Sequence, residues 1–541
     1  MKKLSYVITI LAALLFVSCG KPEPDSGDQT GKVLIGYKEL LAAYDAGKMY
    51  VEVLKEADVN HVVFQDGSKI SVPVSSFDIH DHTAGKVPTI GVQAGMQWWT
   101  VGDMLTTIKV LPAYTPNEKA EPVYVYYSLK TLYMHLSNRQ VLEFESKANA
   151  DHEELERKQN IPEVYINTGG KPILDKENYV DGTITIKDPG KLYSDVTEFT
   201  AAMGIRGRGN STWSFPKKPY KVKLKEKASI FGMGADKEWA LLANYSDRTL
   251  MRNIVAMKLS EICGFSWTPH MYSVHVYLNQ EYQGVYTLCE HKKVHKDRVN
   301  IDLDAGDIYL EIEQQQDETT CWWTGMGVPM MFSDPEEPSA ELLAEIKKWF
   351  DDFEKVLYSD KIGDPDKGYE AYIDVDSFID YFIVQELAKN TDGNLRKSSF
   401  ITKKKGGKLE MYHLWDFDLT FGNNGGVLHD PEGWWVKDYA PWCGIGDNWF
   451  NRMFTDPAFV DRVQARWNEL LPQLQTIPAF IDEQALILDK AKDRNFQVWN
   501  INEYVDWVDC PSLGSYDAEV EFLKEFYTER LEWMTREINK L

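Results

Sequence analysis

Residues 390–394 of the chain read Asn-Thr-Asp-Gly-Asn, and residues 415–418 read Trp-Asp-Phe-Asp. A helix is predicted from residue 375 to residue 389, directly before the first of these segments. Residues 399–402 and 408–414 are expected to pair as strands around a Lys-Lys-Gly-Gly turn, directly before the second. The pattern therefore predicts a helix, a loop and a hairpin, with acidic residues where the helix and the hairpin end.

This order places Asp392 at a helix-to-loop junction and Asp416 and Asp418 at the exit of a strand. Phosphoryl-transfer sites are built in this way, because one carboxylate orients or deprotonates the acceptor hydroxyl while another holds the divalent ion that neutralises the triphosphate. Carboxylate oxygens suit Mg²⁺ or Mn²⁺. However, Asp-Gly-Asn is also an ordinary turn, and the aspartate of a Trp-Asp pair is often a structural hydrogen-bond acceptor, so local spacing leaves both interpretations open.

Several longer motifs surround these aspartates in the chain. They are residues 204–213 (Gly-Ile-Arg-Gly-Arg-Gly-Asn-Ser-Thr-Trp), 217–220 (Lys-Lys-Pro-Tyr), 239–247 (Trp-Ala-Leu-Leu-Ala-Asn-Tyr-Ser-Asp), 250–253 (Leu-Met-Arg-Asn), 284–286 (Gly-Val-Tyr) with Glu290, and 414–422. In this order they resemble the signature of the CotH (spore coat protein H) family, an atypical protein-kinase-like group. The resemblance spans roughly residues 161–541 and implies an α+β fold with two lobes.

The resemblance also implies roles for the acidic residues. Members of the family lack a normal glycine-rich loop, and the founding members phosphorylate spore coat proteins using ATP and a divalent metal ion. By motif, Asp392 corresponds to the catalytic carboxylate and Asp416 to a ligand of Mg²⁺ or Mn²⁺. Asp418 corresponds to a second metal ligand or to a support for the first.

Basic residues of the earlier motifs are candidates for phosphate contact. On the resemblance, Lys218, or Lys223 in second place, contacts phosphate, and Glu290 orients that lysine or closes a salt bridge. Arg206 and Arg208 stand between glycines, where a guanidinium can bind phosphate through two hydrogen bonds. These arginines lack the following Lys-Ser/Thr of a Walker loop, so a structural ion pair is the alternative role.

The first residues resemble a bacterial lipoprotein signal. Lys2 and Lys3 precede an apolar run over residues 4–15, and Phe-Val-Ser-Cys at 16–19 is similar to a lipobox. The run is too short for a comfortable transmembrane span, so residues 1–19 are expected to be a signal segment that is removed, with Cys19 lipidated. The chain is then expected to be anchored to a bacterial membrane, at the outer membrane or cell surface.

Composition shifts divide the rest of the chain. Residues 20–32 are polar and rich in Gly, Pro and Asp, as expected for a flexible tether. Residues 33–145 carry short strand-like runs with turn signals, such as Asp-Gly between residues 61–64 and 70–72, and predict a small β-rich module. Residues 146–160 predict a charged linker, and residues 161–541 the CotH-like domain.

The charge balance limits the partners. Asp and Glu outnumber Lys and Arg by 83 to 59, and a net charge of -24 disfavours nucleic acid. A lysine-rich strip at 217–227 either holds phosphate or is a solvated strand edge. The cysteines show no spacing typical of zinc sites or of a disulfide framework, although one bridge is possible in an oxidising compartment.

Two functions fit these observations. The first is phosphoryl transfer from ATP to a hydroxyl group of a protein or other acceptor. The alternative is a non-catalytic surface adhesin or glycan-associated protein that reuses the scaffold, favoured by the scarcity of ATP outside the cell and by Trp pairs at 322–323 and 434–435. A glycoside hydrolase is disfavoured, because the carboxylates accompany a basic strand and no sugar-cleft signature.

Overall fold

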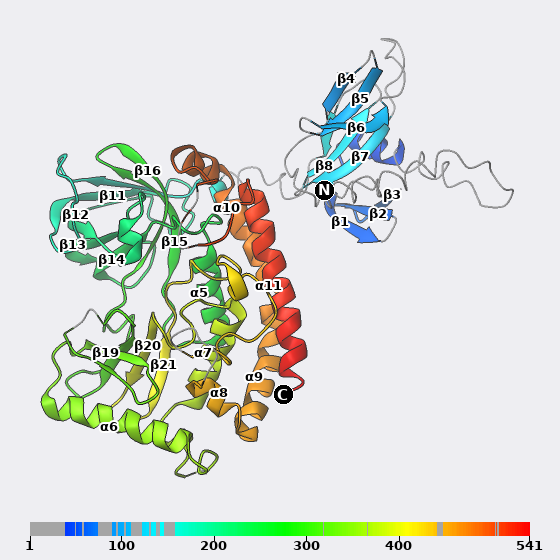
Figure 1. Cartoon of the computed structure of the whole chain (residues 1–541). Coiled ribbons are helices and arrows are strands. Elements are labelled where there is room, and N and C mark those ends of the chain that lie inside the picture. The colour runs from blue at the N-terminus through cyan, green and yellow to red at the C-terminus, as the bar shows by residue number, and fades with distance from the viewer. Residues whose placement is uncertain are drawn as a thin grey trace. The chain divides into compact units, whose positions relative to one another are not determined.

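A computed structural model divides the chain into two compact units, residues 1–156 and 157–541 (Figure 1). The structure describes residues 38–48, 50–56, 59–73, 89–93, 96–101, 104–109, 122–128, 131–136, 141–144, 157–316, 319–364, 366–440, 447–503, 505 and 508–541. The predicted signal segment, Cys19, the tether and most of the predicted linker lie outside these residues. Within the described part, no helix is both long and apolar enough to cross a membrane.

The described part of the first unit contains a helix at residues 38–45 and three antiparallel sheets of three strands each. The strands are β1 (Tyr50–Glu56), β2 (Val59–Phe64) and β3 (Lys69–Pro73); β4 (Thr89–Gln93), β5 (Met96–Val101) and β6 (Met104–Lys109); and β7 (Pro122–Ser128), β8 (Thr131–Leu136) and β9 (Val141–Phe144). The predicted Asp-Gly hairpin is confirmed as β2 and β3. Val62 and Phe64 share a small core with Leu132 and Met134 of β8, so the first and third sheets pack together.

The second unit begins with a closed barrel of seven strands. They are β10 (Glu163–Asn167), β11 (Val180–Lys187), β12 (Glu198–Gly207), β13 (Tyr220–Ala228), β14 (Asp236–Leu242), β15 (Met271–Leu278) and β16 (Glu281–Glu290). The barrel closes where β10 pairs in parallel with β15. Alternate residues such as Val222 and Leu224 fill its interior, while the lysines between them point outward. From residue 220 onward, the predicted lysine-rich strip is therefore an amphipathic barrel strand.

A second, antiparallel sheet follows, with the strand order β18-β19-β17-β20-β21. Its strands are β17 (Ile308–Ile312), β18 (Cys321–Trp323), β19 (Pro329–Asp334), β20 (Ser399–Lys403) and β21 (Leu409–His413). The predicted hairpin before the second acidic segment is confirmed as β20 and β21. It therefore delivers residues 415–418 to the edge of this sheet.

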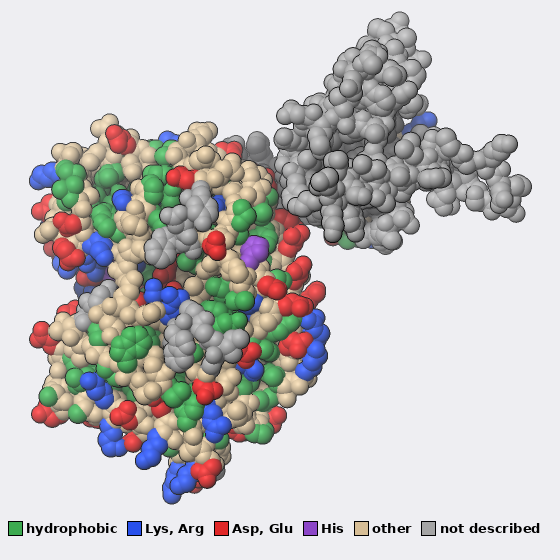
Figure 2. Space-filling model, in the orientation of Figure 1, with side chains coloured by type: hydrophobic (Ala, Val, Ile, Leu, Met, Phe, Trp, Pro, Cys, Tyr) green, Lys and Arg blue, Asp and Glu red, His purple; other side chains and the backbone are tan. Residues whose placement is uncertain are grey.

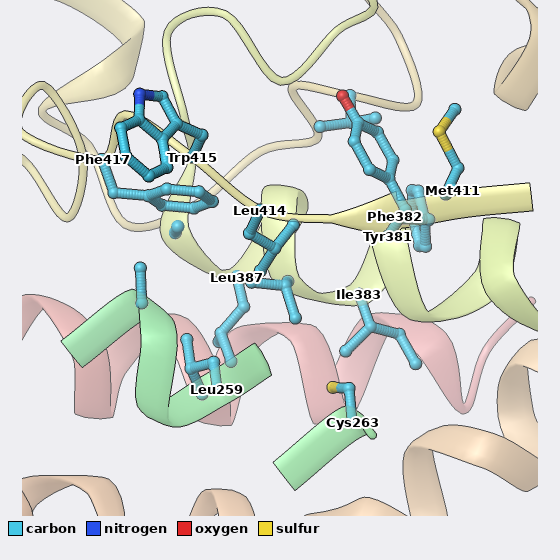
Figure 3. Packing of buried hydrophobic residues seen from close by; sticks show 14 of the residues in the cluster. Leu259, Cys263, Tyr381, Phe382, Ile383, Leu387, Met411, Leu414, Trp415 and Phe417 are labelled. Atoms are coloured by element: carbon cyan, nitrogen blue, oxygen red, sulfur yellow. The ribbon is translucent and has the colours of Figure 1, made fainter. Parts of the chain in front are cut away.

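Helices complete the second unit (Figure 1). They are α5 (Arg252–Cys263), α6 (Ala340–Leu357), α7 (Val375–Ala388), α8 (Trp449–Met453), α9 (Pro457–Leu474), α10 (Ile477–Val498) and α11 (Tyr516–Ile538). The predicted helix at 375–389 is confirmed as α7, which begins at its N-cap Asp374 and ends at Lys389 in the left-handed conformation. In Figure 3, Leu259 of α5 and Leu387 of α7 meet below Leu414, and all three are fully buried.

The end of α7 is held by buried charges. Arg530 of α11 pairs with Glu386 at 2.5 Å and donates to the Pro431 and Gly433 carbonyls at 2.8 Å. Both charged side chains have no exposed surface, so loss of one would leave the other uncompensated. The pair therefore ties α7, α11 and the loop at 430–433 into one assembly. Mixed α and β structure behind a β-rich N-terminal region agrees with the predicted α+β class.

His413 at the end of β21 is enclosed as a neutral ring. Its Nε2 accepts from the Tyr309 hydroxyl at 2.7 Å, its Nδ1 donates to the Leu414 carbonyl at 3.1 Å, and its ring stacks on Phe400. Burial lowers the pKa of His413 to about 3, against about 6.5 in an unfolded chain. Between these values the unfolded chain binds a proton that the folded chain does not, so the free energy of unfolding falls as the pH falls.

We expect the melting temperature to fall more steeply between about pH 7 and about pH 5 for the native chain than for the Tyr309→Phe/His413→Phe double variant. The double variant removes the titrating ring together with the hydroxyl that it would leave without an acceptor. Calorimetry at a series of pH values measures both slopes. Equal slopes would show that His413 does not contribute to acid lability.

Candidate functional site

A cavity of about 560 Å³ lies in the second unit, where the barrel meets the second sheet. The lining residues are Arg208, 209–212, Phe215, Lys217, Pro219 and 242–246 from the barrel; Asn253 of α5; Lys292 after β16; Glu311, Glu313, Gln315 and Met331 from the second sheet; and 390–392, 396–398, 415–416, 418–419 and Asn424 from the loops after α7 and β21. Segments far apart in the chain therefore converge on one space, and all three predicted aspartates lie in its wall.

The loop that carries Asp392 leaves α7 in a fixed direction. The Asp392 backbone N–H is bonded to Asn390 Oδ1 at 3.1 Å, and Trp435 Nε1 donates to the Asn390 carbonyl at 2.6 Å. Arg396, one turn further on, lies 3.6 Å from Asp392 Oδ1. Burial raises the pKa of Asp392, while Lys397 and Arg396 oppose the rise. The loop thus presents a carboxylate of increased basicity to the cavity.

Asp416 is held in an unfavourable backbone conformation. Its φ is 67°, in the left-handed region that costs a non-glycine residue about 1–2 kcal/mol. The flanking Trp415 and Phe417 are buried, and the Phe417 N–H donates to Asn253 Oδ1 at 2.7 Å. Asp416 itself is exposed to the cavity. Strain of this kind is concentrated at functional sites, because the surroundings must enforce it.

Asp418 is less exposed than Asp416. The Ser246 hydroxyl donates to its Oδ2. Burial and the nearby Asp416 carboxylate together raise the pKa of Asp418 to about 7. Two neighbouring carboxylates repel each other, and a cation bound by both relieves that repulsion.

The chemistry of these donors fits a hard divalent ion. Asp416 and Asp418 supply carboxylate oxygens, the ligands that Mg²⁺ and Mn²⁺ prefer. Among the described residues, no group of three His, Cys, Asp or Glu side chains is arranged to hold a metal alone. Magnesium bound with nucleotides typically takes one or two protein carboxylates and completes its shell with phosphate and water. The two aspartates therefore suit an ion that arrives with a phosphate ligand.

Two cations line the barrel side of the cavity. The Arg208 guanidinium lies 5.7 Å from the centre of the Trp415 ring, and burial lowers its pKa. The preceding Gly207 packs against the Trp213 ring, which a Cβ at that position would approach to 2.6 Å. Lys217 is 1% exposed and donates to the Val285 carbonyl at 2.5 Å and to Asn495 Oδ1 at 3.0 Å. Burial also lowers its pKa.

Other predicted phosphate-binding residues are directed elsewhere. Lys218 Nζ donates to the Trp213 carbonyl at 2.7 Å, and exposed Lys223 lies 3.5 Å from Glu238. Arg206 lies over the Tyr179 ring at 5.2 Å. None of these three belongs to the described lining of the cavity.

Glu290 was predicted to orient a lysine or to close a salt bridge. Its carboxylate accepts from the His270 backbone N–H at 3.1 Å, and its other oxygen lies 3.9 Å from Arg298. The structure therefore places it in an ionic network under the loop after β16, and its nearest described cations are His270 and Arg298 instead of Lys218.

Several lining residues were not identified from the sequence. Lys217 directly precedes Lys218, which was predicted from the sequence to contact phosphate. The alternation of side chains along a strand does not tell which of two adjacent lysines turns inward. Lys292 pairs with Glu311 and lies 4.4 Å from the centre of the Phe400 ring. Glu311 in β17 and Glu313 just after it alternate with Leu310 and Ile312, a period-2 signal that indicates two faces but not what each face meets.

Comparison with known proteins agrees with this architecture. The family model described as CotH kinase protein matches residues 205–534, which include every residue that lines the cavity. Because the match covers more than half of the chain, the chain belongs to the CotH family, as the motifs predicted. No curated protein sequence matches the chain.

Arg208, which lines the cavity, is expected to respond to substitution differently from Lys218 and Lys223, which are not among its described lining residues. If the cavity binds Mg²⁺-ATP, Arg208→Met should weaken that binding about tenfold or more, because a charge-assisted hydrogen bond contributes about 1.5–3 kcal/mol. Lys218→Met and Lys223→Met should leave the affinity within about twofold, because their ammonium groups are directed away from the cavity. Calorimetric titration of the three variants measures this. A large loss of affinity in Lys218→Met or Lys223→Met, with unchanged affinity in Arg208→Met, would show that a lysine and not Arg208 contacts the nucleotide.

Proposed function

We propose that the cavity transfers the γ-phosphoryl group of ATP to a hydroxyl acceptor, and that the barrel and the helical part form the two lobes of a kinase-like domain. The main support is the meeting of Asp392, Asp416 and Asp418 with Arg208 in one cavity, although they come from three separate segments. A structural role for the aspartates does not explain why the strained Asp416 faces open space. Membership of a kinase family points to the same chemistry.

In the proposed reaction, the loop with Asp392 and the loop with Asp416 and Asp418 have different roles. Asp392 accepts the proton of the acceptor hydroxyl, whose oxygen bonds to the γ-phosphorus while the bond from that phosphorus to the bridging oxygen breaks and ADP departs. Its raised pKa makes it a better proton acceptor than an exposed aspartate. Arg208 stabilises negative charge on the phosphates. A divalent cation held by Asp416 and Asp418 supplies further charge neutralisation.

The alternative, a non-catalytic glycan-binding protein, has less support from the second unit. Trp322 and Trp435 are buried at 9% and 3% exposure, and Trp434 packs against Trp533 with ring centres 4.8 Å apart. Trp323, at 51% exposure, remains as a possible platform for stacking. The Trp98-Trp99 pair lies in β5, and its side chains are outside the described residues. Figure 2 shows acidic and basic side chains interspersed over one face of the second unit.

Nucleotide binding is the first test of the proposal. The melting temperature of the full chain should rise with ATP and Mn²⁺ together, because a ligand that binds only the folded state stabilises it by mass action. No change at millimolar nucleotide would favour the binding-protein alternative.

Substitution of Asp392 and substitution of Asp416 should affect nucleotide binding and phosphoryl transfer differently. In Asp416→Ala, Mn²⁺-dependent nucleotide affinity and transfer should fall together by about tenfold or more. In Asp392→Ala, nucleotide should bind within about twofold of the native affinity, while transfer falls by about 100-fold or more. Asp352→Ala, at an exposed position on α6 paired with Lys348, is the matched control. If both variants only melt at lower temperature and bind nucleotide normally, the aspartates are structural.

We also propose that the chain is exported and anchored through Cys19, on the support of residues 1–32 of the sequence. Cys19→Ala should abolish incorporation of a labelled fatty acid and release the protein from the membrane fraction, because the polar stretch behind it offers no second anchor. Labelling and fractionation of cells that express the two forms measure this. Continued attachment of the variant to membranes would refute anchoring through this cysteine.

A further inference from the structure

Two carboxylates at the end of β17 line the cavity. Glu311 lies in the strand and Glu313 directly follows its last residue, Ile312. The mechanism proposed above uses neither residue.

The two carboxylates have different surroundings. Glu311 pairs with Lys292. Glu313 is 7% exposed, and its Oε1 accepts from the Gln315 backbone N–H at 3.0 Å. Among the described residues, no side chain donates a hydrogen bond to Glu313. A carboxylate that is largely buried and keeps free acceptor positions toward a cavity is costly unless a ligand supplies donors.

Glu313 is also tied to the loop that carries Asp392. The Gln314 N–H donates to the Arg396 carbonyl at 3.1 Å, and Arg396 Nε donates to Gln314 Oε1 at 2.7 Å. Arg396 lies beside Asp392. The position of Glu313 in the cavity wall is therefore coupled to that of the Asp392 loop.

Mixed charges around Glu313 suit a neutral ligand with hydroxyl donors. Lys292, Arg396 and Lys397 line the cavity together with Glu311 and Asp392, so charge alone favours neither a cationic nor an anionic ligand. Burial raises the pKa of Glu313 to about 7, with Glu311 and Asp392 adding to the rise and Lys397 opposing it. A group of this kind accepts hydrogen bonds from hydroxyls without the need for a counter-ion.

We propose that Glu313 accepts hydrogen bonds from a vicinal diol of a sugar ring in the cavity. The proposal deepens the phosphoryl-transfer function and rests on it. Two ligands carry this chemistry, the ribose of the nucleotide donor and a glycan acceptor, so the experiment treats them separately.

The test compares the full chain with Glu313→Ala, Glu313→Gln and the control Glu345→Ala, whose carboxylate is exposed and pairs with Lys405 on the surface of α6. In the first arm, Mg²⁺-ATP and Mg²⁺-2′,3′-dideoxy-ATP are titrated into each protein. If the diol is the ribose, the native chain and Glu345→Ala prefer ATP by about tenfold or more, and Glu313→Ala reduces this preference to within about twofold. Glu313→Gln keeps the shape of the side chain and should show an intermediate preference.

In the second arm, maltotriose and a Lys-Ser peptide are titrated in the absence of nucleotide. Glu313-dependent binding of maltotriose supports the proposal with the glycan as the source of the diol. The proposal is overturned if neither the preference for ATP nor the binding of maltotriose depends on Glu313. It is also overturned if only the binding of the peptide depends on Glu313. If the native chain binds neither nucleotide, the phosphoryl-transfer function fails, and the maltotriose arm alone decides the diol site.

Discussion

The burial of helix α7 is the constraint on which the second unit depends. Most of its side chains are buried, and it packs against α5, α9, α11 and β21. A helix enclosed on so many sides has little freedom to shift or rotate, because close-packed interiors resist small displacements. Its C-terminal end therefore fixes the starting point of the loop with Asp392. The pair Glu386 and Arg530 fastens that end to the last helix, and the left-handed Lys389 turns the chain toward the cavity.

Acidic and basic side chains line the cavity together, but only some of the described ones form ion pairs with each other. Lys292 has Glu311, and Arg396 has Asp392, but Asp416, Asp418 and Glu313 lack comparable described partners. Structural ion pairs in protein interiors normally approach balance, because an uncompensated buried charge is costly. Carboxylates that face an open space without a paired cation are the arrangement expected where ligands complete the balance.

Local patterns in the sequence were sufficient for much of the fold. The helix before Asp392, the hairpin before Asp416 and the hairpin at β2 and β3 each follow from residue periodicity and turn chemistry within a few positions. The barrel was not predicted, because its closure depends on β10 meeting β15 more than a hundred residues later. For the same reason the partners of Glu290 were not predicted, since His270 and Arg298 reach it only through the tertiary fold. Lys217 and Lys218 differ by one position, and only the packing of Lys217 against Val285 and Asn495 decides which of them lies in the cavity.

The contact between Gly422 and α11 has a consequence for the order in which the protein matures. A Cβ at Gly422 would lie 2.7 Å from Phe526 and 2.8 Å from Phe522, so the loop that follows Asp416 and Asp418 takes its shape against rings encoded about a hundred residues later. Domains acquire structure progressively as the chain emerges during synthesis. The aspartates of this chain are synthesised long before the surface that shapes their loop exists. The nascent protein thus carries its acidic residues without a finished cavity until the last helix has docked.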